Sequence, residues 1–134
     1  GYLANSITEV SDSSVYFKGG VVAYADQVKV ANGVPAAIIR KHGAVSQETA
    51  TAMARAIRQK LGADFGIGIT GVVGPSELAG KPVGLAYLSV AGADAVREME
   101  LRLPPRRAVI KRRSSNQALI ELRKLLVAAA PVPG

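Results

Sequence analysis

The segment from residue 46 to residue 75 constrains the fold of this chain more than any other. Apolar residues recur at helical spacing after Ser46, and Gly62 stands where a helix would stop, so the pattern predicts a helix here. Glu48 suits its first turn, because a carboxylate complements the helix dipole. A Gly- and Ile-rich strand over residues 64–69 then enters a glycine turn at residues 70–75. A helix followed by a buried strand is typical of α/β proteins.

Elements on both sides of this unit extend the pattern. The sequence predicts a helix ending near Val10, a polar turn at 11–14, a strand at 21–24, a helix capped by Asp26, strands at 83–90 and 97–103 joined by a hairpin at 92–94, and a last helix after Pro104-Pro105 that ends before Pro131. A chain of 134 residues fits a single domain, over residues 1–134, and strands that alternate with helices predict its fold class. Its expected fold is a three-layer α/β/α sandwich around a mixed, mostly parallel sheet.

Composition excludes several kinds of chemistry. The chain has no cysteine, which rules out disulfides, thiolate metal sites and a thiol nucleophile, and it has a single histidine, His42. We expect His42 to lie in a loop before the Ser46 helix, with a packing or capping role rather than a place in a catalytic triad. No apolar run reaches the roughly 18 residues that a membrane span needs. These features predict a soluble, cytoplasmic protein without a metal.

The net charge of +7 comes from one part of the chain. Eight basic residues and one acidic residue lie between Arg102 and Lys124, and the remaining charges cancel. A solvated helix face is the ordinary reason for such a run. Binding of phosphate groups, or of nucleic acid, is the alternative. We expect nucleic-acid binding to be the weaker of these possibilities.

Candidate binding residues follow from the expected sheet. Ligands of α/β folds bind beyond the carboxyl ends of parallel strands, and Tyr24 and Thr70 stand at two predicted strand ends. The Thr70 hydroxyl is suited to a substrate contact, and the amides from Gly71 to Gly74 are suited to a phosphate or an oxyanion. An ordinary strand-to-loop turn is the alternative interpretation.

Six short motifs in a fixed order resemble one protein family, the C-terminal domain of the CinA (competence/damage-inducible) family. The resemblance runs from Gly1 to about Leu126. The motifs are Ser13-Ser14-Val15-Tyr16-Phe17, Gly19-Gly20-Val21-Val22-Ala23-Tyr24, Lys29, His42-Gly43-Ala44-Val45-Ser46, Thr70-Gly71-Val72-Val73-Gly74-Pro75 and Lys81-Pro82-Val83-Gly84.

The resemblance implies an activity and roles for particular residues. It implies hydrolysis of the carboxamide of nicotinamide mononucleotide to nicotinic acid mononucleotide and ammonia, without a metal or organic cofactor, in a protein that self-associates as a homodimer. By position, Ser14 resembles the nucleophile, Lys29 its general base and Tyr24 a supporting catalytic residue. A lysine acts as a base only when its amine is neutral, which burial favours. The substrate-binding residues expected from the sequence are Thr70, Gly71, Gly74, Arg107 and Arg112.

The chain departs from the family pattern in two places. The family's sheet begins with a strand that leads into a Glu-Ser-x-Thr-Gly-Gly turn, and Gly1 matches only the last glycine of that motif. We therefore expect the domain to lack its N-terminal helix, first strand and most of that turn. The loop at residues 76–80 also replaces several glycines of the family, and Pro104-Pro105-Arg106 replaces small and acidic residues. A nucleotide-binding module that no longer turns over its ligand is thus the alternative function.

Overall fold

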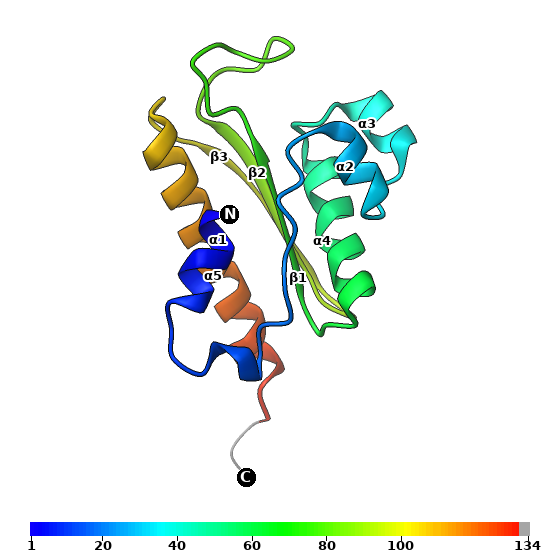
Figure 1. Cartoon of the computed structure of the whole chain (residues 1–134), viewed down its shortest axis with the longest axis vertical. Coiled ribbons are helices and arrows are strands. Elements are labelled where there is room, and N and C mark those ends of the chain that lie inside the picture. Colours follow the sequence, from blue (N-terminus) through cyan, green and yellow to red (C-terminus); the bar gives the residue numbers. More distant parts are fainter. Residues whose placement is uncertain (132–134) are drawn as a thin grey trace.

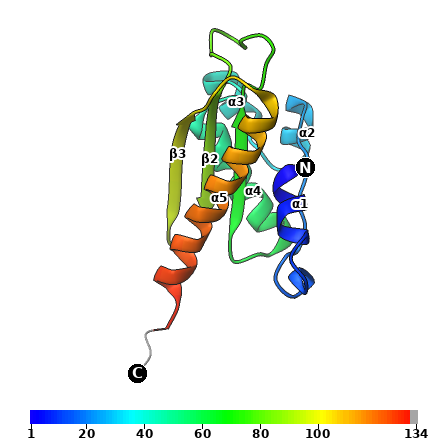
Figure 2. The same ribbon diagram turned by 90° about the vertical axis from the view of Figure 1, so that its left-hand side faces the viewer.

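The computed structural model describes residues 1–131, which form a sheet with helices packed on both of its faces (Figures 1 and 2). The elements in chain order are α1 (Tyr2–Thr8), a single 3₁₀ turn η1 (Ser13–Val15), α2 (Asp26–Ala31), α3 (Ala36–His42), α4 (Gln47–Leu61), β1 (Gly66–Gly71), β2 (Leu85–Ala91), β3 (Val96–Arg102) and α5 (Arg107–Ala129). Figure 1 shows α1 and α5 on one side of the sheet and α2, α3 and α4 on the other. None of the helices in residues 1–131 is long and apolar enough to cross a membrane.

The three described strands pair in the order β1-β2-β3, and both pairings are antiparallel. The expected mixed, mostly parallel sheet is therefore not found in residues 1–131. The predicted β2–β3 hairpin is confirmed, and the Gly92 amide closes its turn by donating to the Ala95 carbonyl at 2.8 Å. Parallel or antiparallel pairing depends on contacts between distant segments, which strand propensity does not encode.

Helix α4 has the ends that the sequence predicts. Ser46 is its N-cap, and its side chain accepts a hydrogen bond from the Thr49 amide at 3.2 Å. Gly62 ends the helix in the left-handed conformation, with φ of 59°, as C-terminal glycines commonly do. The fully buried Ala50 and Ala54 face the sheet. These small side chains bring the helix close to the strand beneath it.

The approach of α4 to β1 explains the glycines of that strand. A Cβ atom on Gly66 would lie 2.1 Å from the Ala54 carbonyl oxygen, and one on Gly68 would lie 2.1 Å from the Ala50 carbonyl oxygen. Both positions therefore require glycine if the helix and strand are to keep this spacing. On the opposite face of the sheet, Ile110 and Ala118 of α5 are buried. The core thus lies on both sides of β1 and β2.

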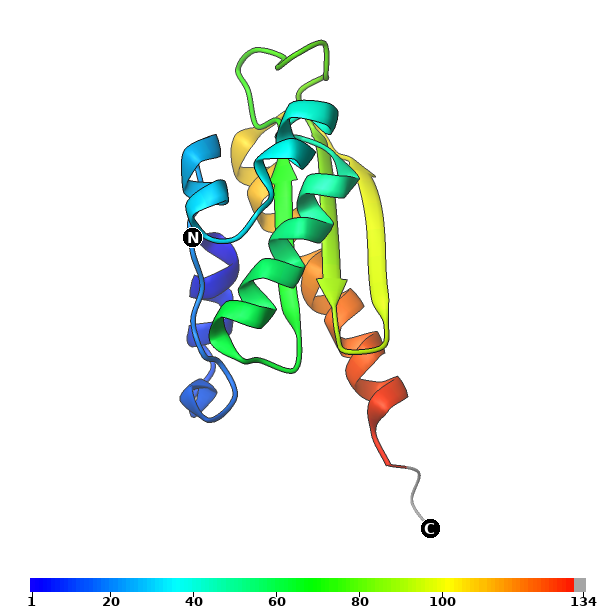
Figure 3. The same ribbon diagram turned by 90° about the vertical axis from the view of Figure 1, so that its right-hand side faces the viewer.

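Three predictions about local structure are wrong. Asp26 is not the cap of the helix that it precedes in the prediction, because α2 begins at Asp26, has Ala25 as its N-cap and has no side-chain cap bond. Residues Val21–Tyr24 are not a strand, because no neighbouring strand among the described residues pairs with them. They belong to an extended segment at 18–24. This segment lies between η1 at one end of the molecule and α2 at the other, and it runs in the same direction as β1 (Figure 3). His42 does not lie in a loop but is the last residue of α3, and its Nδ1 is 3.7 Å from the Glu48 carboxylate.

Candidate functional site

Two adjoining cavities lie between the extended segment at 18–24, the edge of β1 and helix α5. The lower cavity, of about 630 Å³, is lined mostly by apolar side chains. The upper cavity, of about 540 Å³, contains the polar groups. Val22, Lys29 and Ile67 line both cavities, so the two form one continuous groove along β1. The upper cavity is the candidate functional site because chemistry-bearing side chains gather there.

Lys29 supplies the buried amine of the site, with only 6% of its surface exposed. It lies in the last turn of α2, and its Nζ donates to the carbonyl oxygens of Ala23 at 2.9 Å and Tyr24 at 3.3 Å. The Asp26 carboxylate is 3.9 Å away and largely exposed. A lysine amine has up to three N–H donors, so the two carbonyls orient it while one position stays open toward the groove.

Arg107 connects three elements at the rim of the upper cavity. Its Nη1 donates to the Gly74 carbonyl at 2.8 Å, and its Nη2 donates to the Tyr24 hydroxyl oxygen at 2.9 Å. The guanidinium therefore joins the first turn of α5 to the glycine turn and to the end of the extended segment. Tyr24 is 78% exposed, so its ring covers the rim rather than filling the core.

The glycine turn after β1 forms another wall of the upper cavity. Thr70, Gly71 and Gly74 all line it. The Thr70 hydroxyl donates to the Ala44 carbonyl at 2.7 Å, which leaves its oxygen lone pairs to accept a bond from a ligand. Lys81 Nζ donates to the Val45 carbonyl and lies 5.7 Å from the centre of the Tyr87 ring. Lys81 therefore attaches the end of the loop at residues 76–80 to the connection between α3 and α4.

The structure does not bring the predicted nucleophile to the predicted base. Ser14 is exposed, belongs to η1 and lines neither cavity, whereas Lys29 lines both. Ser14 in η1 precedes the extended segment, and Lys29 in α2 follows it. Arg112 is also exposed and lines neither cavity, because its position on α5 points away from the groove.

Two side chains of the site were missed in the sequence. Lys111 and Ser115 of α5 both line the upper cavity. They follow Arg107 by four and eight residues, and such a spacing places all three on one face of a helix. The spacing was a usable signal, because it favours Lys111 over Arg112 once Arg107 is taken as a ligand.

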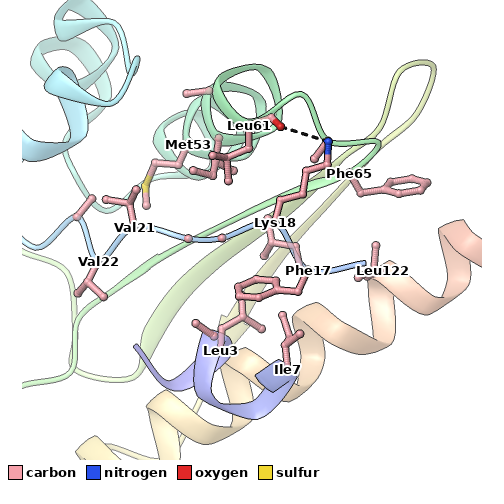
Figure 4. A pocket seen from close by; sticks show the side chains of 18 of the residues that line it. Leu3, Ile7, Phe17, Lys18, Val21, Val22, Met53, Leu61, Phe65 and Leu122 are labelled. Carbon is pink, nitrogen blue, oxygen red and sulfur yellow. Dashed lines mark hydrogen bonds between the residues drawn. The ribbon is translucent and has the colours of Figure 1, made fainter. Parts of the chain in front are cut away.

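The lower cavity has the shape of a largely apolar trough, with Lys18 among its lining residues (Figure 4). Leu3 and Ile7 of α1, Met53 of α4 and Leu122 of α5 point into it from different sides. Lys18 closes its end by donating from Nζ to the carbonyl oxygens of Gly62 at 2.8 Å and Leu61 at 3.4 Å. These carbonyls end α4, where the helix dipole favours a cation.

Metal ligation finds no support in the side chains of residues 1–131. No group of three or more His, Cys, Asp or Glu residues in this range is placed to hold a metal ion.

Comparisons with known proteins agree with the resemblance found in the sequence. Residues 1–126 match the family described as the CinA C-terminal domain. The chain is 41% identical over 127 residues to a CinA-like protein of Frankia casuarinae, covering 94% of this chain and 29% of that protein. It is 43% identical over 129 residues to a CinA-like protein of Koribacter versatilis, covering 95% and 31%. The chain thus spans about three tenths of the length of these relatives.

Solved structures share the fold over nearly the whole chain. The competence/damage inducible protein CihA of Agrobacterium tumefaciens superposes with a TM-score of 0.89 at 32% identity, covering 93% of this chain and 78% of that one. The competence damage-inducible protein A (ComA) of Klebsiella pneumoniae gives a TM-score of 0.91 at 23% identity, covering 97% and 82%. The second likeness concerns the fold alone.

Proposed function

Because the chain belongs to the CinA C-terminal domain family, we propose that it hydrolyses the carboxamide of nicotinamide mononucleotide, giving nicotinic acid mononucleotide and ammonia. The family resemblance supplies the substrate, and the upper cavity supplies groups suited to the reaction. The reaction would serve salvage of pyridine nucleotides.

The position of Lys29 is the observation that carries this proposal. Its amine is almost entirely buried, it is oriented by two backbone carbonyls, and it faces a cavity large enough for a mononucleotide. A buried amine oriented in this way is suited to accept a proton from an attacking hydroxyl and to return it to the leaving group. Ordinary surface lysines are neither buried nor held in one orientation by backbone carbonyls.

Amide hydrolysis at this position requires a defined set of proton movements. A hydroxyl oxygen attacks the carboxamide carbon while its proton passes to Lys29. The carbon–nitrogen bond then breaks, and the nitrogen leaves as ammonia with the proton from Lys29. Where the attacking group is a side-chain hydroxyl, water hydrolyses the resulting ester. The amides of Gly71 and Gly74 are suited to stabilise the negative charge that develops on the carbonyl oxygen.

The source of the attacking hydroxyl separates two versions of the proposal. The Ser14 assignment needs a rearrangement that carries Ser14 from outside both cavities to Lys29. A serine in the Glu-Ser-x-Thr-Gly-Gly turn of the family pattern is the alternative source, since Gly1, which matches the last glycine of that turn, lines both cavities, as Lys29 does. We therefore favour a hydroxyl from this preceding turn, with Lys29 as its base.

Release of ammonia from nicotinamide mononucleotide is the direct test. The chain of 134 residues and a form that carries its natural preceding residues are assayed side by side, with Lys29→Met in each background. We expect turnover in the longer form and its loss with Lys29→Met. Equal turnover by parent and Lys29→Met would reject Lys29 as the base.

A nucleotide-binding module without turnover is the second candidate function. It is favoured by one observation, that Ser14 and Lys29 do not share a cavity. Binding of nicotinamide mononucleotide without ammonia release, in both forms of the chain, would select this candidate.

We also propose that an additional strand occupies the groove along β1. The edge of β1 opposite β2 pairs with no described strand, and the extended segment at 18–24 runs alongside it in the same direction (Figure 3). An extended chain between them would satisfy backbone groups on both sides and cover the apolar lower cavity. The strand expected before Gly1 from the family pattern fits this role and would give the sheet its parallel pairs.

Hydrogen exchange tests directly whether a strand occupies this groove. In the form with its natural preceding residues, the β1 amides should exchange more slowly than in the chain of 134 residues. Equal exchange rates of the β1 amides in the two forms would reject the additional strand. We further propose a cytoplasmic homodimer that works without a cofactor, and sedimentation of the longer form tests the dimer.

A further inference from the structure

The connection between α3 and α4, at residues 43–46, forms part of the wall of the upper cavity. Ala44 and Val45 both line that cavity. Val45 and Ser46 are buried, so this short stretch of backbone has little access to water. Its carbonyl oxygens therefore need hydrogen-bond donors from the protein.

Two side chains from outside the connection donate to neighbouring carbonyls. The Thr70 hydroxyl, near the end of β1, donates to the Ala44 carbonyl at 2.7 Å. Lys81 Nζ donates to the next carbonyl along the chain, that of Val45. Because peptide groups are planar, only the two backbone rotations at Val45 separate these carbonyls, and holding one of them restricts the other. Lys81 thus acts on the partner of the Thr70 hydroxyl.

Lys81 is itself held against β2. It is half-buried, and its Nζ lies 5.7 Å from the centre of the Tyr87 ring, whose face attracts a cation. The Tyr87 hydroxyl donates to the Glu100 carboxylate of β3 at 3.0 Å, which fixes the ring. Lys81 therefore connects the wall of the upper cavity to the sheet.

The bond to Ala44 uses the only proton of the Thr70 hydroxyl. Thr70 is 8% exposed and lines the upper cavity, so its oxygen can act toward a ligand only as an acceptor. A carboxamide has two N–H donors, whereas a carboxylate has none and is negatively charged. A hydroxyl held in this way favours an amide over the corresponding acid.

We infer that Thr70 distinguishes the carboxamide of the substrate from the carboxylate of the product, and that Lys81 is the positioning residue that keeps the Thr70 hydroxyl turned to Ala44. The amide nitrogen donates to Thr70 Oγ1 before hydrolysis. After hydrolysis a carboxylate oxygen meets the same lone pair, which favours release of the product. This inference rests on the proposed function, which assigns the amide and the acid to this cavity.

The test is calorimetric titration with nicotinamide mononucleotide and with nicotinic acid mononucleotide. The measured quantity is the ratio of the dissociation constant of the acid to that of the amide. Lys111 and other cations of the cavity also attract the acid, so variants are compared by the change in this ratio. All proteins have the natural preceding residues and carry Lys29→Met, so that the amide is not hydrolysed during the titration.

The variants in this background are Thr70→Val, Lys81→Met, Lys81→Arg and the control Lys18→Met. Lys18 is matched to Lys81 because its Nζ also donates to backbone carbonyls, those of Leu61 and Gly62, but it lines only the lower cavity. Melting curves check that each variant is folded.

The expected pattern differs for each variant. Thr70→Val lowers the ratio about five- to ten-fold, the range for one hydrogen bond between neutral groups. Lys81→Met lowers it several-fold and has no further effect when added to Thr70→Val, because Lys81 acts through Thr70. Lys81→Arg restores the parent ratio, since a guanidinium keeps a donor for Val45 and a cation near Tyr87. Lys18→Met leaves the ratio unchanged.

Three outcomes would overturn the inference. They are an unchanged ratio in Thr70→Val, equal weakening of both ligands by Lys81→Met, and a ratio lowered as much by Lys18→Met as by Lys81→Met. The proposed reaction is judged separately, from ammonia release by the proteins that keep Lys29. The expected ratios without ammonia release would reject the reaction and keep the discrimination, whereas ammonia release with unchanged ratios would do the reverse. Failure of the folded parent to bind either nucleotide would reject both.

Discussion

Arg107 Nη2 donates a hydrogen bond to the Tyr24 hydroxyl oxygen at 2.9 Å, and this bond joins two residues separated by 83 positions in the chain. The same guanidinium holds the Gly74 carbonyl. One side chain therefore fixes the relative positions of the helix, the glycine turn and the extended segment that surround the upper cavity.

Tyr24→Phe tests whether this bond positions the site. The bond is exposed, so its loss should change the free energy of unfolding by less than about 0.5 kcal/mol. We expect kcat/KM for nicotinamide mononucleotide to fall several-fold, because Arg107 loses one of its two anchors. Thermal melting and steady-state kinetics on the same preparation separate the two effects. A large drop in melting temperature would show instead that the bond serves stability.

Comparison of Ser14→Ala with Lys29→Met tests the catalytic roles. General acid–base catalysis contributes about 10²- to 10⁴-fold, so Lys29→Met should reduce kcat by at least about a hundred-fold. Ser14→Ala should stay close to the parent, because Ser14 lies outside both cavities. Ammonia release measured in the form with natural preceding residues decides the matter. Equal losses of kcat in the two variants would instead support Ser14 as the nucleophile and Lys29 as its base, as the family resemblance implies.

Local features of the sequence predicted local structure well. The ends of α4 at Ser46 and Gly62 were predicted because capping depends on a few neighbouring residues. The hairpin between β2 and β3 was predicted for the same reason, since alternating residues flank a short turn. Helix α3 was not predicted, because a helix of seven residues is too short to show a clear helical periodicity of apolar residues.

Long-range features were not accessible in this way. Val21–Tyr24 has the composition of a strand, but a strand also needs a partner, and none of the described residues provides one. For the site, Tyr24, Lys29, Thr70, Gly71 and Gly74 all line the upper cavity, and their functional roles stay predictions. The order of the motifs did not reveal that Ser14 lies outside this cavity, because the path of the chain between η1 and α2 is set by packing.

Gly68→Ala tests the close approach of α4 to β1. The added Cβ would lie 2.1 Å from the Ala50 carbonyl oxygen and 2.7 Å from the Ala54 amide nitrogen, so helix and strand must separate. We expect a loss of at least about 1–3 kcal/mol in the free energy of unfolding, measured by urea denaturation. Gly20→Ala is the matched control, because the nearest atom to its Cβ is 3.9 Å away. Similar losses in both variants would mean that glycine content alone, and not this contact, governs stability.

Glu121 gives the fold a predictable dependence on pH. It is 1% exposed, and although burial alone raises the pKa of its carboxyl, the hydrogen bonds and charges of Arg97 and Lys124 outweigh burial and lower that pKa below its ordinary value of 4.5. A carboxyl with a lowered pKa in the folded state contributes stability above the unfolded pKa and loses it as the pH falls through the folded pKa. This contribution should therefore be complete at neutral pH and decline below about pH 4.5.

Glu121→Gln removes this contribution, since a neutral amide cannot pair with the Arg97 guanidinium of β3. Both cationic partners are about half exposed and stay solvated, so the loss at pH 7 should be about 1–2 kcal/mol rather than the full cost of breaking a buried pair. Urea denaturation at pH 7 and pH 3.5 measures it. The gap between parent and variant should narrow at the lower pH, because the Glu121 carboxyl takes up a proton in the unfolded parent below about pH 4.5, which reduces the advantage of the ionised folded state. An equal gap at both pH values would assign the effect to packing, not to the charge of the carboxylate.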